Sequence, residues 1–364
     1  MRTLKDKDAY LVLGDGSVYC GKSFGAEGMA IGEIVCSTAV VGYQETLTDP
    51  CCFGQIVLQT FPLLGNYGVN SDDGESDRVY PSGYVVREKC DLPSNFRCEG
   101  TLDEYLKKNN VVGIYGIDTR ALTRKIKDSE IINCVITTTL PENIEELLLK
   151  IDNYKITEAV EKVSCKEPYV LKCDNKRYTV CLYDYGVRRS MLDALLKHGC
   201  EVVVLPYNTP IDDALKYKPD GFVLSDGPGC PDNYTDLAGV IKEIFSSGIP
   251  VIGSGLGHQL AALANGGRVK KLPFGHRGAN VPVTDVKNDK VYITSQNHGY
   301  AVSGDSISDE IGEISFINTN DKTCEGIIYK SGNAVTVQFR PDICEDTDGK
   351  TLFDEFICMM ERRK

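Results

Sequence analysis

The chain has 364 residues and a formal net charge of −12, with 42% hydrophobic and 25% charged residues. This length allows about two domains. The acidic balance and the lack of any lysine- or arginine-rich run argue against a nucleic-acid surface. No uninterrupted apolar stretch of ~18 residues occurs, which argues against a membrane span. The first residues lack the apolar core of a secretory signal, so we expect a cytoplasmic protein.

Fifteen cysteines raise the question of disulfides or zinc. No C-x-x-C pair occurs, and the adjacent pair Cys51-Cys52 is poorly placed to bond to itself. Only four histidines are present, and they are not clustered with cysteines at zinc-site spacing. We therefore expect free thiols in a reducing compartment and no metal site.

The first part of the chain has the pattern of a β-rich α+β domain. Residues 9–13 and 17–20 flank a Gly14-Asp-Gly turn, which predicts a hairpin. Glycine-punctuated β segments and turns follow to about residue 90, including 42–50 and 65–68. Helices are predicted over 101–109, 119–127 and 141–150. We assign residues 1–150 to this domain and the polar, weakly patterned residues 151–175 to a linker.

From residue 176 to 364 strands alternate with helices, which predicts a doubly wound, mostly parallel sheet. Ligands of such sheets bind at the carboxyl ends of the strands. Three motifs fall there, at 184–186, 225–231 and 255. The predicted strands are 178–183, 201–205, 221–225 and 250–253, and the predicted helices 190–198, 211–216 and 235–246.

Residues 250–260 read as a strand–turn–helix elbow, with a helix beginning near Gly257. An elbow holds its apex residue in a strained conformation and needs small residues two positions to either side. Gly253 and Gly257 are that pair, so the apex is Gly255, which has no side chain to attack a substrate. Free N–H groups at the helix start would form an oxyanion hole. The elbow therefore lacks its nucleophile.

At these residues the chain resembles the small subunit of carbamoyl-phosphate synthetase, a class I glutamine amidotransferase. The resemblance extends over essentially the whole chain, and its N-terminal motifs match a domain that other class I amidotransferases lack. Its motifs are LYDYGVRRSML (182–192), LSDGPGCP (224–231), GLGHQLAALANG (255–266), KLPFGHRGANVPV (271–283), ITSQNHGYAV (293–302), TAVVGYQETLTDP (38–50), GNYGVN (65–70), SNFR (94–97) and GIDTRALTR (116–124).

The resemblance implies a glutaminase with a cysteine nucleophile, a histidine base and an orienting glutamate. The matching positions here are Gly255, Arg340 and Asp342. Glycine offers no nucleophile, and an arginine side chain does not accept a proton at neutral pH. Aspartate retains the carboxylate, one methylene shorter. We therefore expect the glutaminase to be inactive.

The positions that would bind glutamine are better preserved. Tyr300 stands where the family often has phenylalanine, and Cys51 where it often has a serine that contacts substrate. Cys230 replaces the aspartate of the family's GPGDP motif. The resemblance implies that glutamine is bound without hydrolysis by Cys51, Gly227, Gly229, Leu256, Gln259, Asn297, Gly299 and Tyr300.

The resemblance also implies a partner, the large subunit, on which ATP, magnesium and bicarbonate are expected; no cofactor is expected on this chain. The leading hypothesis is a complex that runs on free ammonia, with this chain in a structural and allosteric role. One alternative is an active amidotransferase with a relocated nucleophile at Ser254, Cys230 or Cys344. A second is a stand-alone glutamine sensor. His298 is the best substitute base, whereas His258 matches a histidine that is not the catalytic base.

Overall fold

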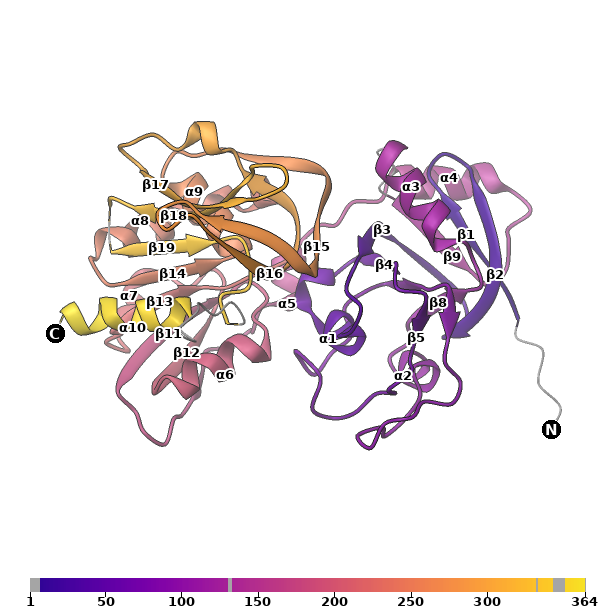
Figure 1. Cartoon of the computed structure of the whole chain (residues 1–364), viewed down its shortest axis with the longest axis horizontal. Helices are drawn as coiled ribbons and strands as arrows, with labels where there is room; N and C mark the ends of the chain where they lie inside the picture. The colour runs from indigo at the N-terminus through magenta and orange to yellow at the C-terminus, as the bar shows by residue number, and fades with distance from the viewer. Residues whose placement is uncertain (1–6, 130–132, 332, 343–350, 364) are drawn as a thin grey trace. The chain divides into compact units, whose positions relative to one another are not determined.

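The computed structural model describes residues 7–129, 133–331, 333–342 and 351–363 (Figure 1). The chain divides into two compact units, Met1–Thr157 and Glu158–Lys364. The division falls inside the stretch expected to be a linker. That stretch is partly structured, because it contains α5 (Ala159–Val163) and β10 (Tyr169–Leu171), both in the second unit.

The first unit is built on a closed barrel in which every strand is paired on both sides. The predicted hairpin is present as β1 and β2, with Leu11 opposite Tyr19. A two-stranded sheet of β5 (Leu63–Leu64) and β7 (Glu88–Lys89) is separate from the barrel. The barrel strands in spatial order are β1 (Asp8–Leu13), β2 (Val18–Gly25), β8 (Val112–Tyr115), β6 (Gly83–Val85), β4 (Gln55–Gln59), β3 (Met29–Ser37) and β9 (Asn133–Thr137).

The three helices predicted for the first unit are present as α2 (Leu102–Lys108), α3 (Thr119–Ser129) and α4 (Ile144–Asp152). Residues 42–50 were expected to form β segments and turns, but the structure has helix α1 (Tyr43–Thr48) there, followed by the 3-10 turn η1 (Pro50–Cys52). The left-handed Gly42 (φ +82°) starts α1. Tyr43 and Leu47, one helical turn apart, are both buried, so packing of one helical face against the domain favours a helix in this segment.

The second unit contains a ten-stranded sheet with five adjacent parallel strands (Figure 1). The four predicted strands are all among these five, and β19 completes the set. In spatial order the parallel strands are β12 (Cys200–Pro206), β11 (Tyr178–Asp184), β13 (Gly221–Leu224), β14 (Val251–Ser254) and β19 (Ala334–Val337).

Helices cover both faces of the parallel strands, as a doubly wound sheet requires. Cys181 and Tyr183 pack on one face with residues of α7 (Ile211–Leu215), α8 (Ala238–Ser246) and α9 (Leu256–Ala264). The intervening Val180 and Leu182 pack on the opposite face with α6 (Arg189–Lys197) and α10 (Leu352–Arg363). This alternation is the two-residue period of a strand buried on both sides.

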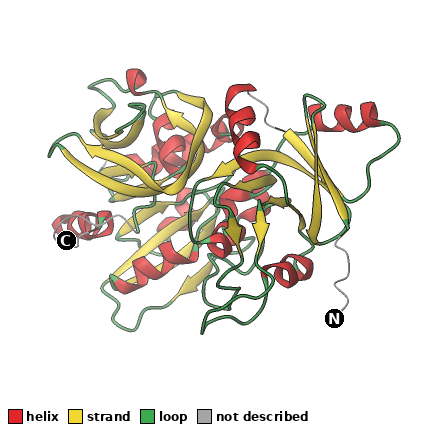
Figure 2. Cartoon of the chain, turned by 45° about the vertical axis from the view of Figure 1, so that its right-hand side comes forward, coloured by secondary structure: helices red, strands yellow, loops and turns green. Residues whose placement is uncertain are grey.

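The rest of the sheet is antiparallel, which the prediction of a mostly parallel sheet did not include (Figure 2, strands in yellow). The short β10 pairs with β12 at one edge. On the other side, short turns join β15 to β16 and β17 to β18, and tight turns can only connect antiparallel neighbours. These strands are β15 (Val269–Asp285), β16 (Lys290–Val302), β17 (Gly312–Asn318) and β18 (Cys324–Tyr329). Among the described residues, no helix is long and apolar enough to cross a membrane.

Candidate active site

The predicted elbow lies between β14 and α9, with Gly255 at its apex. Gly255 has a φ of +51°, which an L side chain rarely adopts. Its amide donates to the carbonyl of Val337 on β19 (3.0 Å), and its carbonyl accepts from the amide of Gln259 one helical turn later (3.2 Å). The apex is thereby fixed both to the sheet and to the helix.

The glycines that flank the apex are required by close packing, as predicted. A Cβ atom on Gly257 would lie 2.3 Å from the carbonyl oxygen of Leu224, at the end of β13. A Cβ atom on Gly253 would lie 2.9 Å from Cγ2 of Thr336 on β19. The elbow therefore fits against its neighbouring strands only with glycine at both positions.

Ser225 joins the three loops that the sequence placed at one end of the sheet. Its hydroxyl accepts a hydrogen bond from the amide of Tyr185, after β11 (2.9 Å). Its carbonyl accepts from the amide of Gly257 (3.0 Å). The loops after β11, β13 and β14 therefore meet. The Gly257 amide, expected to be a free oxyanion donor, is already used to hold the elbow against β13, and that part of the prediction is wrong.

A buried charged cluster lies beside the apex, and the sequence interpretation missed it. The guanidinium of Arg188 is fully buried and donates from Nη2 to Oδ2 of Asp226 (2.5 Å). The same Nη2 is 3.6 Å from Oδ1 of Asp342. Ser254, the last residue of β14, donates its hydroxyl to Oδ1 of Asp226 (2.9 Å). Arg188 and Asp226 both fall within quoted motifs, but an ion pair between them cannot be read from their spacing.

Arg340 and Asp342, which stand at the positions of the family's catalytic histidine and glutamate, follow β19. The side chain of Asp342 is buried, and among the described residues its carboxylate oxygens have no hydrogen-bond partner, only the ion pair with Arg188. Arg340 is half-buried, and its amide donates to the carbonyl of Ser295 (3.0 Å). The carboxylate at 342 therefore compensates the charge of Arg188.

The residues expected to bind glutamine are divided between the two units. Cys51 is buried in η1 of the first unit, where its amide donates to Asp49 (2.9 Å). In the second unit the structure brings together Gly227 and Leu256: a Cβ atom on Gly227 would lie 2.9 Å from the Leu256 side chain. Gly229, with a φ of +96°, belongs to the same loop as Gly227.

The remaining predicted binding residues link helix α9 to strand β16. The side-chain Nε2 of Gln259 donates to the carbonyl of Tyr300 (2.8 Å) and to Oε1 of Gln338 (2.9 Å). Asn297 and Gly299 lie on the same strand as Tyr300. Gln259 is buried, so its side-chain donors hold these two elements together.

The suggested substitute groups are poorly placed for chemistry. Ser254 is buried, and its hydroxyl proton is directed at Asp226. Cys230 is half-buried at the start of the 3-10 segment η2 (Pro231–Leu237). Both ring nitrogens of His298 face oxygen acceptors, Nδ1 the carbonyl of Tyr300 (2.7 Å) and Nε2 the Oε1 atom of Gln296 (2.8 Å), and a neutral imidazole donates to one of them. Burial lowers the pKa of His298 well below its usual value. Cys344 lies outside the described residues.

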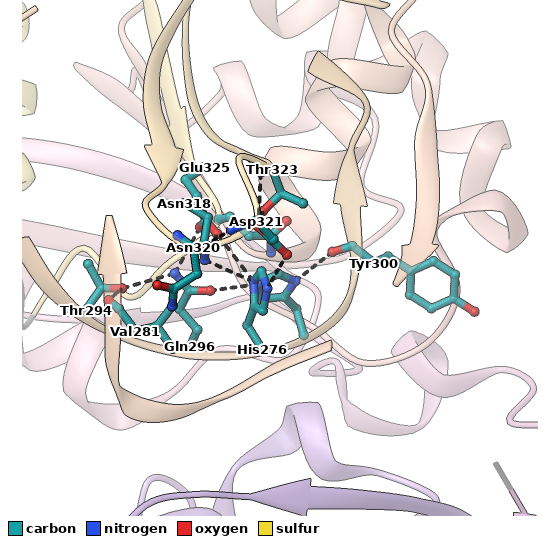
Figure 3. A network of polar contacts seen from close by, with 12 residues as sticks. His276, Val281, Thr294, Gln296, Tyr300, Asn318, Asn320, Asp321, Thr323 and Glu325 are labelled. Carbon is teal, nitrogen blue, oxygen red and sulfur yellow. Dashed lines mark hydrogen bonds and ion pairs between the residues drawn. The ribbon is translucent and has the colours of Figure 1, made fainter. Parts of the chain in front are cut away.

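A polar network around His276 and Glu325 lies in the antiparallel part of the sheet (Figure 3). His298 joins it through its contacts with Gln296 and the Tyr300 carbonyl. Its ring stacks edge-on against His276 at 4.9 Å between centroids. Nε2 of His276 is 2.9 Å from Asp321, and Nδ1 is 3.4 Å from the buried carboxylate of Glu325. Glu325 also accepts from Gln296 (3.0 Å). Atoms of His276, His298 and Glu325 that could ligate a metal lie within 4.8 Å of one another, a spacing that could hold a metal ion. All three side chains, however, form polar contacts with other residues of the protein.

The pKa values of His276, in the network, and His258, in the elbow helix, are shifted in opposite directions. Burial alone would lower the pKa of His276, but the carboxylates of Glu325 and Asp321 outweigh it and raise that pKa. Burial raises the pKa of Glu325. In α9, burial lowers the pKa of His258 to about 3, and its Nδ1 is 2.7 Å from Thr336 Oγ1. His258 is therefore a neutral packing residue, consistent with its predicted non-catalytic role.

Two family models match this chain. The glutamine amidotransferase class-I model matches residues 181–360, and the model of the carbamoyl-phosphate synthase small chain, CPSase domain, matches residues 11–136. The second unit thus has a class I glutamine amidotransferase domain.

Curated relatives match over almost the whole chain. The carbamoyl phosphate synthase small chain of Syntrophotalea carbinolica is 43% identical, with 98% of each chain covered. That of Fusobacterium nucleatum is also 43% identical, over 95% of this chain and 96% of its own. That of Clostridium perfringens is 42% identical, over 96% and 98%. The chain belongs to the carbamoyl phosphate synthase small chain family.

Two solved glutamine amidotransferase structures align with part of the chain. A glutamine amidotransferase from Thermotoga maritima covers 45% of this chain and 76% of its own, with 19% identity and a TM-score of 0.36. A glutamine amido transferase from Methylobacillus flagellatus covers 46% and 71%, with 16% identity and a TM-score of 0.35.

Proposed function

We propose that this chain is a carbamoyl-phosphate synthetase small subunit whose glutaminase centre is inactive, and that it forms an ammonia-dependent complex with a large subunit. One observation carries the proposal: the elbow is fully formed, but its apex is Gly255, which has no side chain (φ +51°). The chemistry at the other two triad positions supports it. Arg340 cannot take up a proton as a base would, and Asp342 lies beside buried Arg188 rather than beside a histidine.

The fold is retained where the chemistry is lost. The flanking glycines, the Ser225 hydrogen bonds and the closed barrel of the first unit are all intact. Such retention is expected of a chain that still docks to a partner and transmits conformational changes. In this proposal ATP, magnesium and bicarbonate act on the large subunit, and the complex is cytoplasmic. Bound glutamine would be an effector, not a nitrogen source.

The test is carbamoyl-phosphate synthesis by the complex of this chain with its cognate large subunit, comparing glutamine with ammonium chloride as nitrogen source. We expect product with ammonium chloride and none with glutamine. Loss of a triad nucleophile or base alone lowers the rate by about 10⁶-fold. Glutamine-dependent synthesis would overturn the proposal.

Matched variants separate the alternatives if glutamine does support synthesis. A relocated nucleophile predicts that Ser254→Ala, Cys230→Ser or Cys344→Ser abolishes the glutamine-dependent rate and leaves the ammonia-dependent rate unchanged. A stand-alone sensor predicts glutamine binding by the isolated chain in calorimetry and no complex with a large subunit. Failure to form that complex would also contradict our proposal.

A further inference from the structure

The apex of the elbow lacks a side chain, and it also lacks room for one. An ideal Cβ atom on Gly255 would lie 2.0 Å from Oδ1 of Asp226 and 2.8 Å from its Cγ. Real Cβ atoms essentially never approach another heavy atom within 3.0 Å. Because both the terminal oxygen and the carbon that bears it are too close, a small rotation of the carboxylate would not remove the overlap.

Asp226 is held in this position from two sides. Oδ2 accepts from Nη2 of Arg188 (2.5 Å), whose side chain is fully buried, and Oδ1 accepts from the hydroxyl of Ser254 (2.9 Å). Moving the carboxylate away from Gly255 would break both contacts and leave a buried guanidinium with its nearest other described carboxylate, Asp342, at 3.6 Å. Separating a buried ion pair is strongly unfavourable.

The geometry points to Asp226 as the residue that fixes the identity of residue 255. Its carboxylate, held by Arg188 and Ser254, occupies the space of an apex side chain and restricts the apex to glycine. Returning a cysteine to position 255 would therefore not return an accessible thiol unless Asp226 is also replaced. This inference concerns the same site as the proposed function, but it stands on packing and does not require that glutamine hydrolysis be absent.

A double-mutant cycle in the full chain tests it: Gly255→Ala, Asp226→Ala and the double variant, each followed by its thermal unfolding midpoint. The strain of placing alanine at a φ of +51° is present in both backgrounds and cancels in the cycle. The overlap with the carboxylate does not cancel. We expect Gly255→Ala to lower the midpoint by several degrees more in the native background than in the Asp226→Ala background.

Gly248→Ala is the matched control. Gly248 has a φ of +67°, and nothing lies within 4 Å of an added Cβ atom, so its substitution introduces strain without overlap. Its effect should be the same in both backgrounds. Equal losses for Gly255→Ala in the two backgrounds would overturn the inference. If Asp226→Ala does not fold, the combined Arg188→Met/Asp226→Ala background removes both charges and replaces it in the cycle.

Thiol labelling provides a second readout. Gly255→Cys and Gly255→Cys/Asp226→Ala are treated with iodoacetamide, and alkylation at residue 255 is followed by peptide mass spectrometry. We expect at least about tenfold faster labelling in the double variant, since thiol reactivity follows exposure and thiolate formation. Equal rates would contradict the inference. Because labelling needs neither glutamine nor the large subunit, its outcome is independent of the nitrogen-source assay.

Discussion

Removing the charge of Arg188 is the sharpest test of how the site is held together. Arg188→Met keeps the apolar length of the side chain but leaves the carboxylates of Asp226 and Asp342 without their shared cation, which lies 2.5 Å and 3.6 Å from them. The arginine side chain is fully buried, so solvent does not screen the loss. Breaking a buried pair by removing one partner costs about 3–5 kcal/mol, and two carboxylates are affected here, so we expect the upper part of that range.

The assay is urea unfolding followed by circular dichroism, with the slope of the transition checked for constancy. Arg268→Met is the matched control, because Arg268 forms a close ion pair with Asp305 (2.8 Å) on the surface, where the two side chains are 69% and 74% exposed. Exposed pairs contribute about 0–1 kcal/mol. A loss for Arg188→Met within about 1 kcal/mol of the control would refute the view that the cluster is a strongly coupled buried ion pair.

Two further predictions concern the elbow and the polar network. Gly257→Ala would place a Cβ atom 2.3 Å from a backbone carbonyl, so we expect a loss of about 3 kcal/mol or more, whereas Gly239→Ala, in helix α8 with open space around it, should stabilise by about 0.5–1 kcal/mol. Similar urea midpoints for the two variants would contradict the packing argument. Because the pKa of His276 is raised in the folded protein, the contribution of this residue to folding stability is complete below its unfolded-state pKa of about 6.5. That contribution is lost as the pH rises through the folded-state pKa. His276→Gln should therefore lower the unfolding midpoint more at about pH 5.5 than at about pH 8.5. A loss of stability that is the same at both pH values would contradict the raised pKa of His276.

Much of the fold follows from local patterns in the sequence. Four of the five parallel strands and the helices between them were predicted within a few residues, because buried strands form continuous apolar runs and the helices between them have one apolar face. Strand β19 and helix α10 were not predicted. The antiparallel half of the sheet was missed. Strand β15 contains glycine and proline and has two register irregularities against β16, so its pattern is too interrupted for a strand to be recognised.

The sequence predicted those features of the candidate site that depend on close packing between residues near one another in the chain. The glycines at 253 and 257 follow from the geometry of an elbow, and the structure shows the close contacts they allow. The Arg188–Asp226 pair could not be found in this way, since its partners are 38 residues apart and meet only when β11 and β13 become neighbours. The same reason hid the engagement of the Gly257 amide, which depends on the position of Ser225 just after another strand, β13.

The position of Asp226 gives the substitutions at this site a preferred order. A single base change can convert a glycine codon to a cysteine codon, yet in this chain that change would place the new side chain against a fixed carboxylate. We expect such a variant to be destabilised unless Asp226 is replaced first. The overlap therefore sets the order of the two substitutions, with the change at residue 226 preceding any larger side chain at residue 255.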